Sequence, residues 1–301
     1  MKDNGLLVQY FNANTPADQT LWAKAAKDAA TLKKLGATAV WFPPATKGAA
    51  GKDDRGYAPY DLYDLGEFNQ KGSVGTRYGT KKEYLEAIDA MKAQGINVYA
   101  DIAVRQKLGA DSVEKVTAAD FNAKDIPQMI GNKKIVGALS KFTFPGRKSK
   151  YSKFKWNWNH FAGIDWQQDD FKRRVCELSG MTEMEAEKKY KLSKYDYIIG
   201  SELDLYNQEV YDELMAWAKW YENVTGVDGF RFQEAEKIPG WFIRDFAEAA
   251  SNAGEEEKEI FTVDVIISMI ISRLRTISHL CLMCRCISVS MMHPLQKENM
   301  I

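Results

Sequence analysis

The sequence predicts an α/β fold that forms an incomplete (β/α)8 TIM barrel, about five of eight strands, with a small domain inserted after the third strand. Two observations carry this prediction. Short β-branched and aromatic runs alternate with segments of helical spacing, which is typical of βαβ units around a parallel sheet. The alternation breaks at residue 105 and resumes near residue 205, so the segment between them is assigned to the insert.

Residues 1–104 are predicted to hold the first three strands and two helices. Each helix is followed by a glycine, Gly36 or Gly95, which is a common helix stop. The expected strands are Leu6–Phe11, Thr38–Phe42 and Ile96–Val104, and the expected helices are Trp22–Leu35 and Lys81–Ala93.

Residues 105–204 hold irregular polar and aromatic segments and are too long for a structureless loop, so they are predicted to fold as the inserted domain. Residues 205–263 return to the alternation and are predicted to hold strands four and five. The expected helices are Glu209–Tyr221 and Phe242–Ala250, and the expected strands are Val227–Gln233 and Glu259–Val263. Residues 264–301 lack this pattern and concentrate Cys, Met, Ile and Ser.

The charge is balanced, with 41 basic and 41 acidic residues among 301. We therefore expect neither a nucleic-acid nor a membrane partner, and no stretch reaches the roughly 18 apolar residues of a membrane span. The N-terminus has no apolar core of signal-peptide length, which predicts a cytoplasmic protein. Cysteines and histidines in the tail have a spacing that zinc sites also use, namely Cys281, Cys284, Cys286, His279 and His293.

The most informative stretch is GVDGFRFQEAEKI, which covers Gly226–Ile238. Its apolar residues Val227, Phe230 and Phe232 predict a buried strand that ends in a polar cluster. In a parallel α/β barrel the carboxyl ends of the strands carry the chemistry. The polar residues from Arg231 onward are therefore expected in a functional site.

Several long motifs in this order resemble the α-amylase family, glycoside hydrolase family 13, of the cytoplasmic or liquefying bacterial type. They run from about Gly5 to Val263 and are LLVQYFNANTP, VWFPPATKG, GYAPYDLYDLGEFNQKGSVGTRYGT, NVYADIAV, KFTFPGRKSKYSKFKWNW, YDYIIGSELDL and GVDGFRF. The resemblance implies retaining hydrolysis of α-1,4-glucan, which needs a carboxylate nucleophile and a carboxylic acid about 5 Å apart.

The catalytic positions depart from the family pattern. The nucleophile position holds Gln233, a neutral amide, and the general-acid position holds Val265. Strand alternation would turn the neighbouring Glu234 to the opposite face from Arg231 and Gln233, so its use as a replacement nucleophile is not favoured. Where the family has Lys and His after the nucleophile, this chain has Glu236 and Lys237.

Other positions of the implied substrate site are kept or exchanged. The resemblance implies that Asp101 and Arg231 brace each other beneath the nucleophile. It also implies that Tyr57 stacks on the bound sugar, although loop packing explains a tyrosine there equally well. The third strand of the family ends in Asn-His, where the His touches the sugar and the Asn binds calcium, whereas this chain has Arg105 and Gln106.

The calcium site that the resemblance implies is partly rewritten. YDYIIGSELDL matches the family's acidic ligand segment, with Asp196, Glu202 and Asp204 at the ligand positions. Calcium takes about six to eight oxygen ligands, but Arg105 places a cation where a neutral oxygen is expected. We predict that the guanidinium pairs with one or more of these carboxylates and stands in for the metal; the alternative is that the acids form a solvated rim.

The tail is consistent with a shifted reading frame. Leu280–Ile301 can be written in synonymous codons whose frame, taken two nucleotides later, spells LFDVPLHFSFYDASVAKGEHD, which is similar to the family's continuation. We infer a frameshift near residue 263, so the cysteines of the tail are not expected to be selected metal ligands.

Four functions fit these observations. The first is an α-amylase-like glycoside hydrolase by descent that is inactive as written. The others are a protein that binds α-glucan without cutting it, a decayed and truncated gene product, and an active enzyme with relocated carboxylates.

Overall fold

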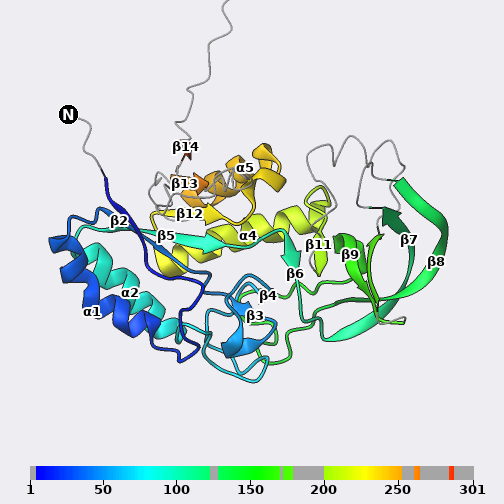
Figure 1. Cartoon of the computed structure of the whole chain (residues 1–301), viewed down its shortest axis with the longest axis horizontal. Helices are drawn as coiled ribbons and strands as arrows, with labels where there is room; N and C mark the ends of the chain where they lie inside the picture. Colours follow the sequence, from blue (N-terminus) through cyan, green and yellow to red (C-terminus); the bar gives the residue numbers. More distant parts are fainter. Residues whose placement is uncertain are drawn as a thin grey trace, which may run out of the picture.

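Two six-stranded sheets organise the part of the chain that the structure describes (Figure 1). The structure is a computed structural model that describes residues 5–122, 128–169, 172–178, 200–252, 261–264 and 285–287. The first sheet contains, side by side in this order, β1 (Leu7–Gln9), β2 (Ala39–Phe42), β5 (Asn97–Ile102), β12 (Gly229–Phe232), β13 (Phe261–Asp264) and β14 (Arg285–Ile287).

The five predicted strands are present and parallel. β1 pairs with β2, β2 with β5, β5 with β12, and β12 with β13, all in parallel register. β1, β2, β5 and β12 are each shorter than predicted, and β13 is described from Phe261 to Asp264. β14 was not predicted; it pairs antiparallel with β13 and lies in the tail, most of which is outside the described residues, including Cys281, Cys284, His279 and His293.

The four predicted helices are confirmed as α1 (Leu21–Lys34), α2 (Lys81–Ala93), α4 (Gln208–Thr225) and α5 (Gly240–Ser251). Thr80 and Glu83 form a capping box that fixes the start of α2, and Gly226 ends α4 in the left-handed region, with φ of 62°. The helices bury apolar faces on the parallel sheet; Phe246 of α5 lies 5.3 Å from Phe230, centroid to centroid. No helix in the described ranges is long and apolar enough to cross a membrane.

The break in the alternation corresponds to a second sheet, whose neighbours all pair antiparallel. Its strands lie in the order β6 (Gln106–Lys107), β11 (Ser201–Leu203), β9 (Phe161–Gln167), β10 (Lys172–Glu177), β7 (Ser112–Asn122) and β8 (Gln128–Lys141). The chain leaves the parallel sheet after β5 and, beyond β11 and α4, re-enters it at β12. Figure 1 shows this sheet at the opposite end of the molecule from α1 and α2.

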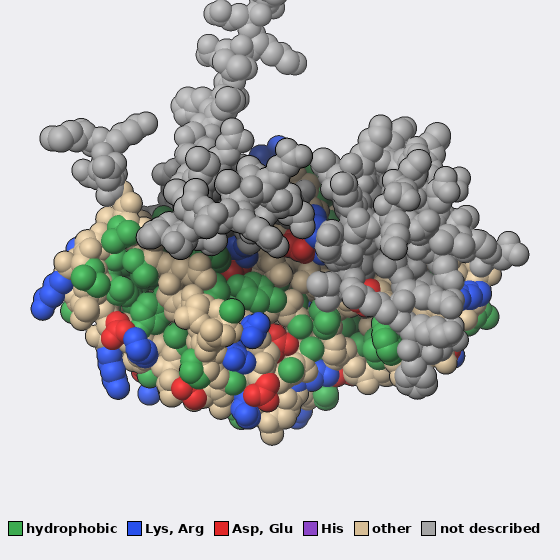
Figure 2. Space-filling view, viewed as in Figure 1, with side chains coloured by type: hydrophobic (Ala, Val, Ile, Leu, Met, Phe, Trp, Pro, Cys, Tyr) green, Lys and Arg blue, Asp and Glu red, His purple; other side chains and the backbone are tan. Residues whose placement is uncertain are grey.

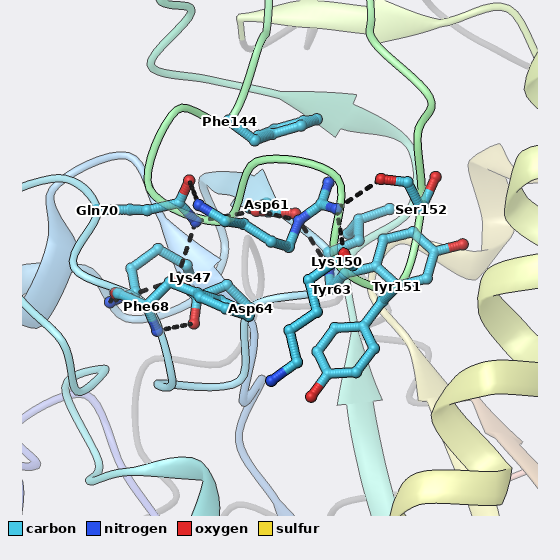
Figure 3. A network of polar contacts seen from close by, with 12 residues as sticks. Lys47, Asp61, Tyr63, Asp64, Phe68, Gln70, Phe144, Lys150, Tyr151 and Ser152 are labelled. Carbon is cyan, nitrogen blue, oxygen red and sulfur yellow. Dashed lines mark hydrogen bonds and ion pairs between the residues drawn. The ribbon is translucent and has the colours of Figure 1, made fainter.

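A buried polar network fixes the segment between β2 and α2 (Figure 3). Nε of Arg147 lies 2.7 Å from Oδ2 of Asp61, and both side chains are 1% exposed. The Gln70 amide donates to both Asp61 and Asp64, at 2.9 and 3.0 Å. Lys47, from β3 (Lys47–Gly48), donates to loop carbonyls, including those of Ser73 and Val74. The loop between β3 and β4 (Pro59–Asp61), which carries Tyr57, is thereby anchored at both ends.

Lys107, at the end of β6, is buried among aromatic rings. Its Nζ lies 5.1–5.5 Å from the ring centroids of Phe142, Phe144 and Trp156. This Nζ has no hydrogen-bond partner among the described residues. Burial lowers the pKa of Lys107 to about 7, against the smaller opposing effect of the Asp61 carboxylate.

We expect Lys107→Met to stabilise the protein at pH 7. Between about pH 7 and pH 10 the unfolded chain binds this proton and the folded chain does not. The native lysine therefore makes the free energy of unfolding rise with pH in this range, by up to about 1.4 kcal/mol per pH unit. In urea unfolding at pH 7, the variant should have a higher midpoint than the native chain. At pH 9 the difference between the two midpoints should be smaller. Lys27→Met, at an exposed position, is the control. A variant that is less stable than the native chain at both pH values would contradict this prediction.

Candidate functional site

Asp101 is the centre of a polar cluster at the carboxyl ends of three adjacent strands. It lies near the end of β5 and is 1% exposed. Oδ2 accepts hydrogen bonds from the Tyr57 hydroxyl at 2.7 Å and from Nε1 of Trp41, on β2, at 3.2 Å. Nη1 of Arg231, on β12, lies 3.1 Å from Oδ1. The parallel register places Asp101 opposite Arg231, so the strand pairing itself brings the two charges together.

The electrostatics of this cluster are set by burial and by one cation. Burial raises the pKa of Asp101 to about 6, and Arg231 opposes that rise. The Arg231 charge thus favours the ionised form of Asp101, against the effect of burial. Burial and the Asp101 charge raise the pKa of Tyr57, so its hydroxyl keeps its proton and donates. The Arg231 guanidinium also lies 5.0 Å from the Trp41 ring centroid, which adds a cation–π contact.

Three of the residues predicted to bind substrate, Tyr57, Gln106 and Arg231, lie together. Nε2 of Gln106 donates to the backbone carbonyl of Tyr57 at 3.2 Å, and Tyr57 and Arg231 both bind Asp101. Gln233 extends the ladder past the end of β12, because its backbone N–H donates to Ile102 at 2.9 Å. Its side-chain Oε1 is buried without a hydrogen-bond partner among the described residues, and so is Nε of Arg231.

The backbone at Glu234 differs from the continuing strand that the alternation prediction assumed. β12 ends at Phe232, and Glu234 adopts a left-handed conformation with φ of 52°. Its carboxylate lies 2.6 Å from Nη2 of Arg105 and 2.6 Å from Nζ of Lys237. Burial opposes ionisation of Glu234, but Lys237 and Arg105 together hold its pKa below the usual value.

The structure describes only some of the remaining predicted residues. Lys237 and Glu236 lie in the short 3-10 helix η4 (Ala235–Lys237), where Lys237 pairs with Glu234, and the side chain of Glu236 is not described. Val265, at the general-acid position, lies outside the described residues.

The acidic segment predicted to bind calcium is partly described. Glu202 and Asp204 are buried at the return of the inserted sheet, and Asp196 lies outside the described residues. The predicted pairing of Arg105 with this segment is confirmed for Glu202, with 2.8 Å between Nη1 and Oε1. Within the described ranges, no three His, Cys, Asp or Glu side chains are grouped to hold a metal ion. With a guanidinium among the carboxylates, the described residues do not fit the calcium that the resemblance implies.

Trp41 and the ion pair of Glu234 with Arg105 were not predicted. Trp41 lies in the run TAVWF, where an aromatic residue indicates core packing. Its position at the carboxyl end of a parallel strand is the signal that could have identified it. Glu234 is adjacent to a functional position, but nothing in the sequence indicates its backbone turn.

No protein-family model matches the chain. Over 273 residues it is 44% identical to an α-amylase from Geobacillus stearothermophilus, an alignment that covers 90% of this chain and 49% of that protein. It is 40% identical over 260 residues to an α-amylase from Bacillus licheniformis, covering 86% of this chain and 50% of the relative. It is also 35% identical over 277 residues to the cytoplasmic α-amylase of Escherichia coli K12, covering 91% of this chain and 55% of the relative. The chain thus spans about half the length of the curated relatives it matches.

A solved structure shows the same fold. It is an α-amylase from Geobacillus thermoleovorans in complex with acarbose, which superposes with a TM-score of 0.50 at 16% identity and covers 88% of this chain and 47% of that one. The identities to the curated relatives, over nearly all of this chain, go further than the fold alone. The chain belongs to the α-amylase family of glycoside hydrolases.

Proposed function

We propose that this chain binds α-1,4-glucan at the Asp101 cluster without hydrolysing it. The observation that carries the proposal is Gln233, which stands at the family's nucleophile position with its side-chain oxygen buried and unpartnered among the described residues. An amide can hydrogen-bond a sugar but cannot supply the negative charge of a glycosidic nucleophile.

The lack of hydrolysis follows from the chemistry of retention. A covalent glycosyl-enzyme intermediate needs a carboxylate at one face of the sugar and a carboxylic acid at the leaving oxygen. The family positions for these groups hold Gln233 and Val265. With neither group present, both the attack on the anomeric carbon and the protonation of the leaving group lose their catalyst.

The binding follows from groups that the fold leaves in place. Oε1 of Gln233 and Nε of Arg231 are an acceptor and a donor that the described part of the protein does not satisfy. Such buried groups are costly unless a partner arrives, and a sugar hydroxyl can both donate and accept. Tyr57 presents a partly buried ring whose hydroxyl is fixed on Asp101, so it is oriented for stacking before a ligand binds.

An active enzyme with a relocated carboxylate is the alternative, and Glu234 is its candidate. The contacts of Glu234 disfavour that role. Its two oxygens are held by Arg105 and Lys237, and their charges lower its pKa. A carboxylate in two short ion pairs is a weakened nucleophile, and a lowered pKa makes it unsuited to act as the acid.

We also place this function in the cytoplasm. The proposal rests on the identity of 35% to a relative named as a cytoplasmic α-amylase.

Binding and cleavage of a fluorescently labelled maltoheptaose by the purified chain test the proposal in one experiment. We expect saturable binding by fluorescence polarisation and no shorter products by chromatography. Tyr57→Ala should weaken binding at least about tenfold, or about 1.4 kcal/mol. Tyr151→Ala, a partly exposed tyrosine outside the Asp101 cluster, should leave binding unchanged. Cleavage by the native chain would overturn the proposal, and a chain that is poorly folded and binds nothing would instead indicate a decayed gene product.

Gln233→Asp should not restore hydrolysis. The substitution returns a carboxylate to the nucleophile position, but the acid position still holds Val265 and the departing glucan stays unprotonated. Release of reducing sugar from starch should equal that of Gln233→Asn, the matched neutral variant. Starch cleavage by Gln233→Asp above that background would show that an acid is present elsewhere in the chain.

A further inference from the structure

Arg105 joins three segments that are far apart in the sequence. It follows β5 at the point where the chain leaves the parallel sheet, and its side chain is 5% exposed. Nη1 donates to Glu202, on β11, at 2.8 Å. Nε and Nη2 both donate to Oε2 of Glu234, in the turn after β12, at 3.1 and 2.6 Å. One guanidinium therefore links β11 of the second sheet to the segments that follow β5 and β12 of the parallel sheet.

The side chains joined by these ion pairs are balanced in charge. Arg105 and Lys237 contribute two positive charges, and Glu202 and Glu234 contribute two negative charges. A divalent cation placed here would meet two carboxylates that are already engaged by cations. It would also have to displace a guanidinium that donates three hydrogen bonds to these two carboxylates.

We propose that Arg105 is a built-in cation that replaces calcium at the junction of β5, β11 and the turn after β12, so that this junction holds together without metal. This role of Arg105 affects stability and ion binding, and it does not depend on whether the chain binds or cleaves glucan.

The chemistry of the guanidinium suits this role. Calcium organises carboxylates from several segments by direct coordination. A guanidinium does the same with directional donors and a permanent charge, and its planar fork can reach two carboxylates at once. A lysine offers a single ammonium in its place and cannot keep the same set of contacts. The replacement is therefore specific to arginine.

The first test uses the unaltered full chain. Calcium chloride is titrated into the chelator-treated protein in a calorimeter, and thermal unfolding is followed with excess calcium and with EDTA. We expect no binding heat and the same Tm in both solutions. Tight calcium binding, or a Tm that rises with calcium, would overturn the proposal.

The second test exchanges the cation for the residue that the family resemblance places there. Arg105→Asn leaves the buried Glu202 and the partly buried Glu234 with one fewer cation, so its Tm in EDTA should fall by about 10 °C. Calcium should recover part of that loss. Arg244→Asn removes an exposed arginine that pairs only with its neighbour Asp245 in the described contacts, and it should show neither effect.

Arg105→Lys keeps the charge and separates the two possible roles of the residue. We expect a Tm between those of the native chain and Arg105→Asn, with no response to calcium. If Arg105→Asn gains no response to calcium in calorimetry or unfolding, the guanidinium does not occupy a metal position and the proposal is wrong. The same holds if Arg105→Lys responds to calcium as strongly as Arg105→Asn does.

Discussion

The buried ion pair between Asp101 and Arg231 fixes the geometry on which the whole site depends. It joins neighbouring parallel strands at directly opposed positions, and it also orients Tyr57 and Trp41. Loss of one partner of such a pair leaves an uncompensated buried charge, at about 3–5 kcal/mol. Selection for folding alone therefore retains the pair, whatever residues occupy the neighbouring positions.

Two further polar networks hold the segments around this pair. Asp61 and Arg147 anchor the loop that carries Tyr57 to the inserted region (Figure 3), and Arg105 anchors the return of the inserted sheet. Each network joins segments that are far apart in the sequence, and the charges of its described ion pairs are balanced. Charged side chains on the visible described surface are likewise interspersed, without a large area of one sign (Figure 2). The buried charges thus define where the parts of the chain meet, while the exposed charges contribute little to the fold.

The sequence predicts elements well where a local chemical signal marks their ends. α2 has the predicted bounds because Thr80 and Glu83 cap it and Gly95 follows it. Strand ends are predicted less well, because no comparable signal marks them: Gln233 is polar, yet its backbone N–H still donates to Ile102 beyond the end of β12. Strand alternation therefore does not apply at Glu234, whose left-handed backbone lies beyond the end of β12. β14 has no sequence signal, because its pairing with β13 is a property of the sheet edge rather than of its own residues.

The residues of the candidate site also differ in whether the sequence marks them. Asp101, Arg231 and Tyr57 were predicted through the family resemblance, whereas composition and periodicity alone describe them as the end of a strand and a loop. Trp41 was missed because an aromatic residue in a buried run fits the core equally well. The partner of Arg105 among the acidic residues was open, since a pairing across 97 residues of sequence is decided by the return of the inserted sheet.

The pattern of changes around Gln233 bears on whether this site is maintained or decaying. Gln233 precedes the inferred frameshift, so the altered tail does not account for it. Changes made without regard to one another would leave unpaired buried charges, as Lys107 is among the described residues of the second sheet, whereas the altered positions next to Gln233 are paired. Here Arg105 lies between Glu202 and Glu234, and Lys237 pairs with Glu234 as well. An unpaired carboxylate or guanidinium at this depth would be strongly destabilising, so these residues are interdependent. Their mutual compensation supports the proposed binding function over decay.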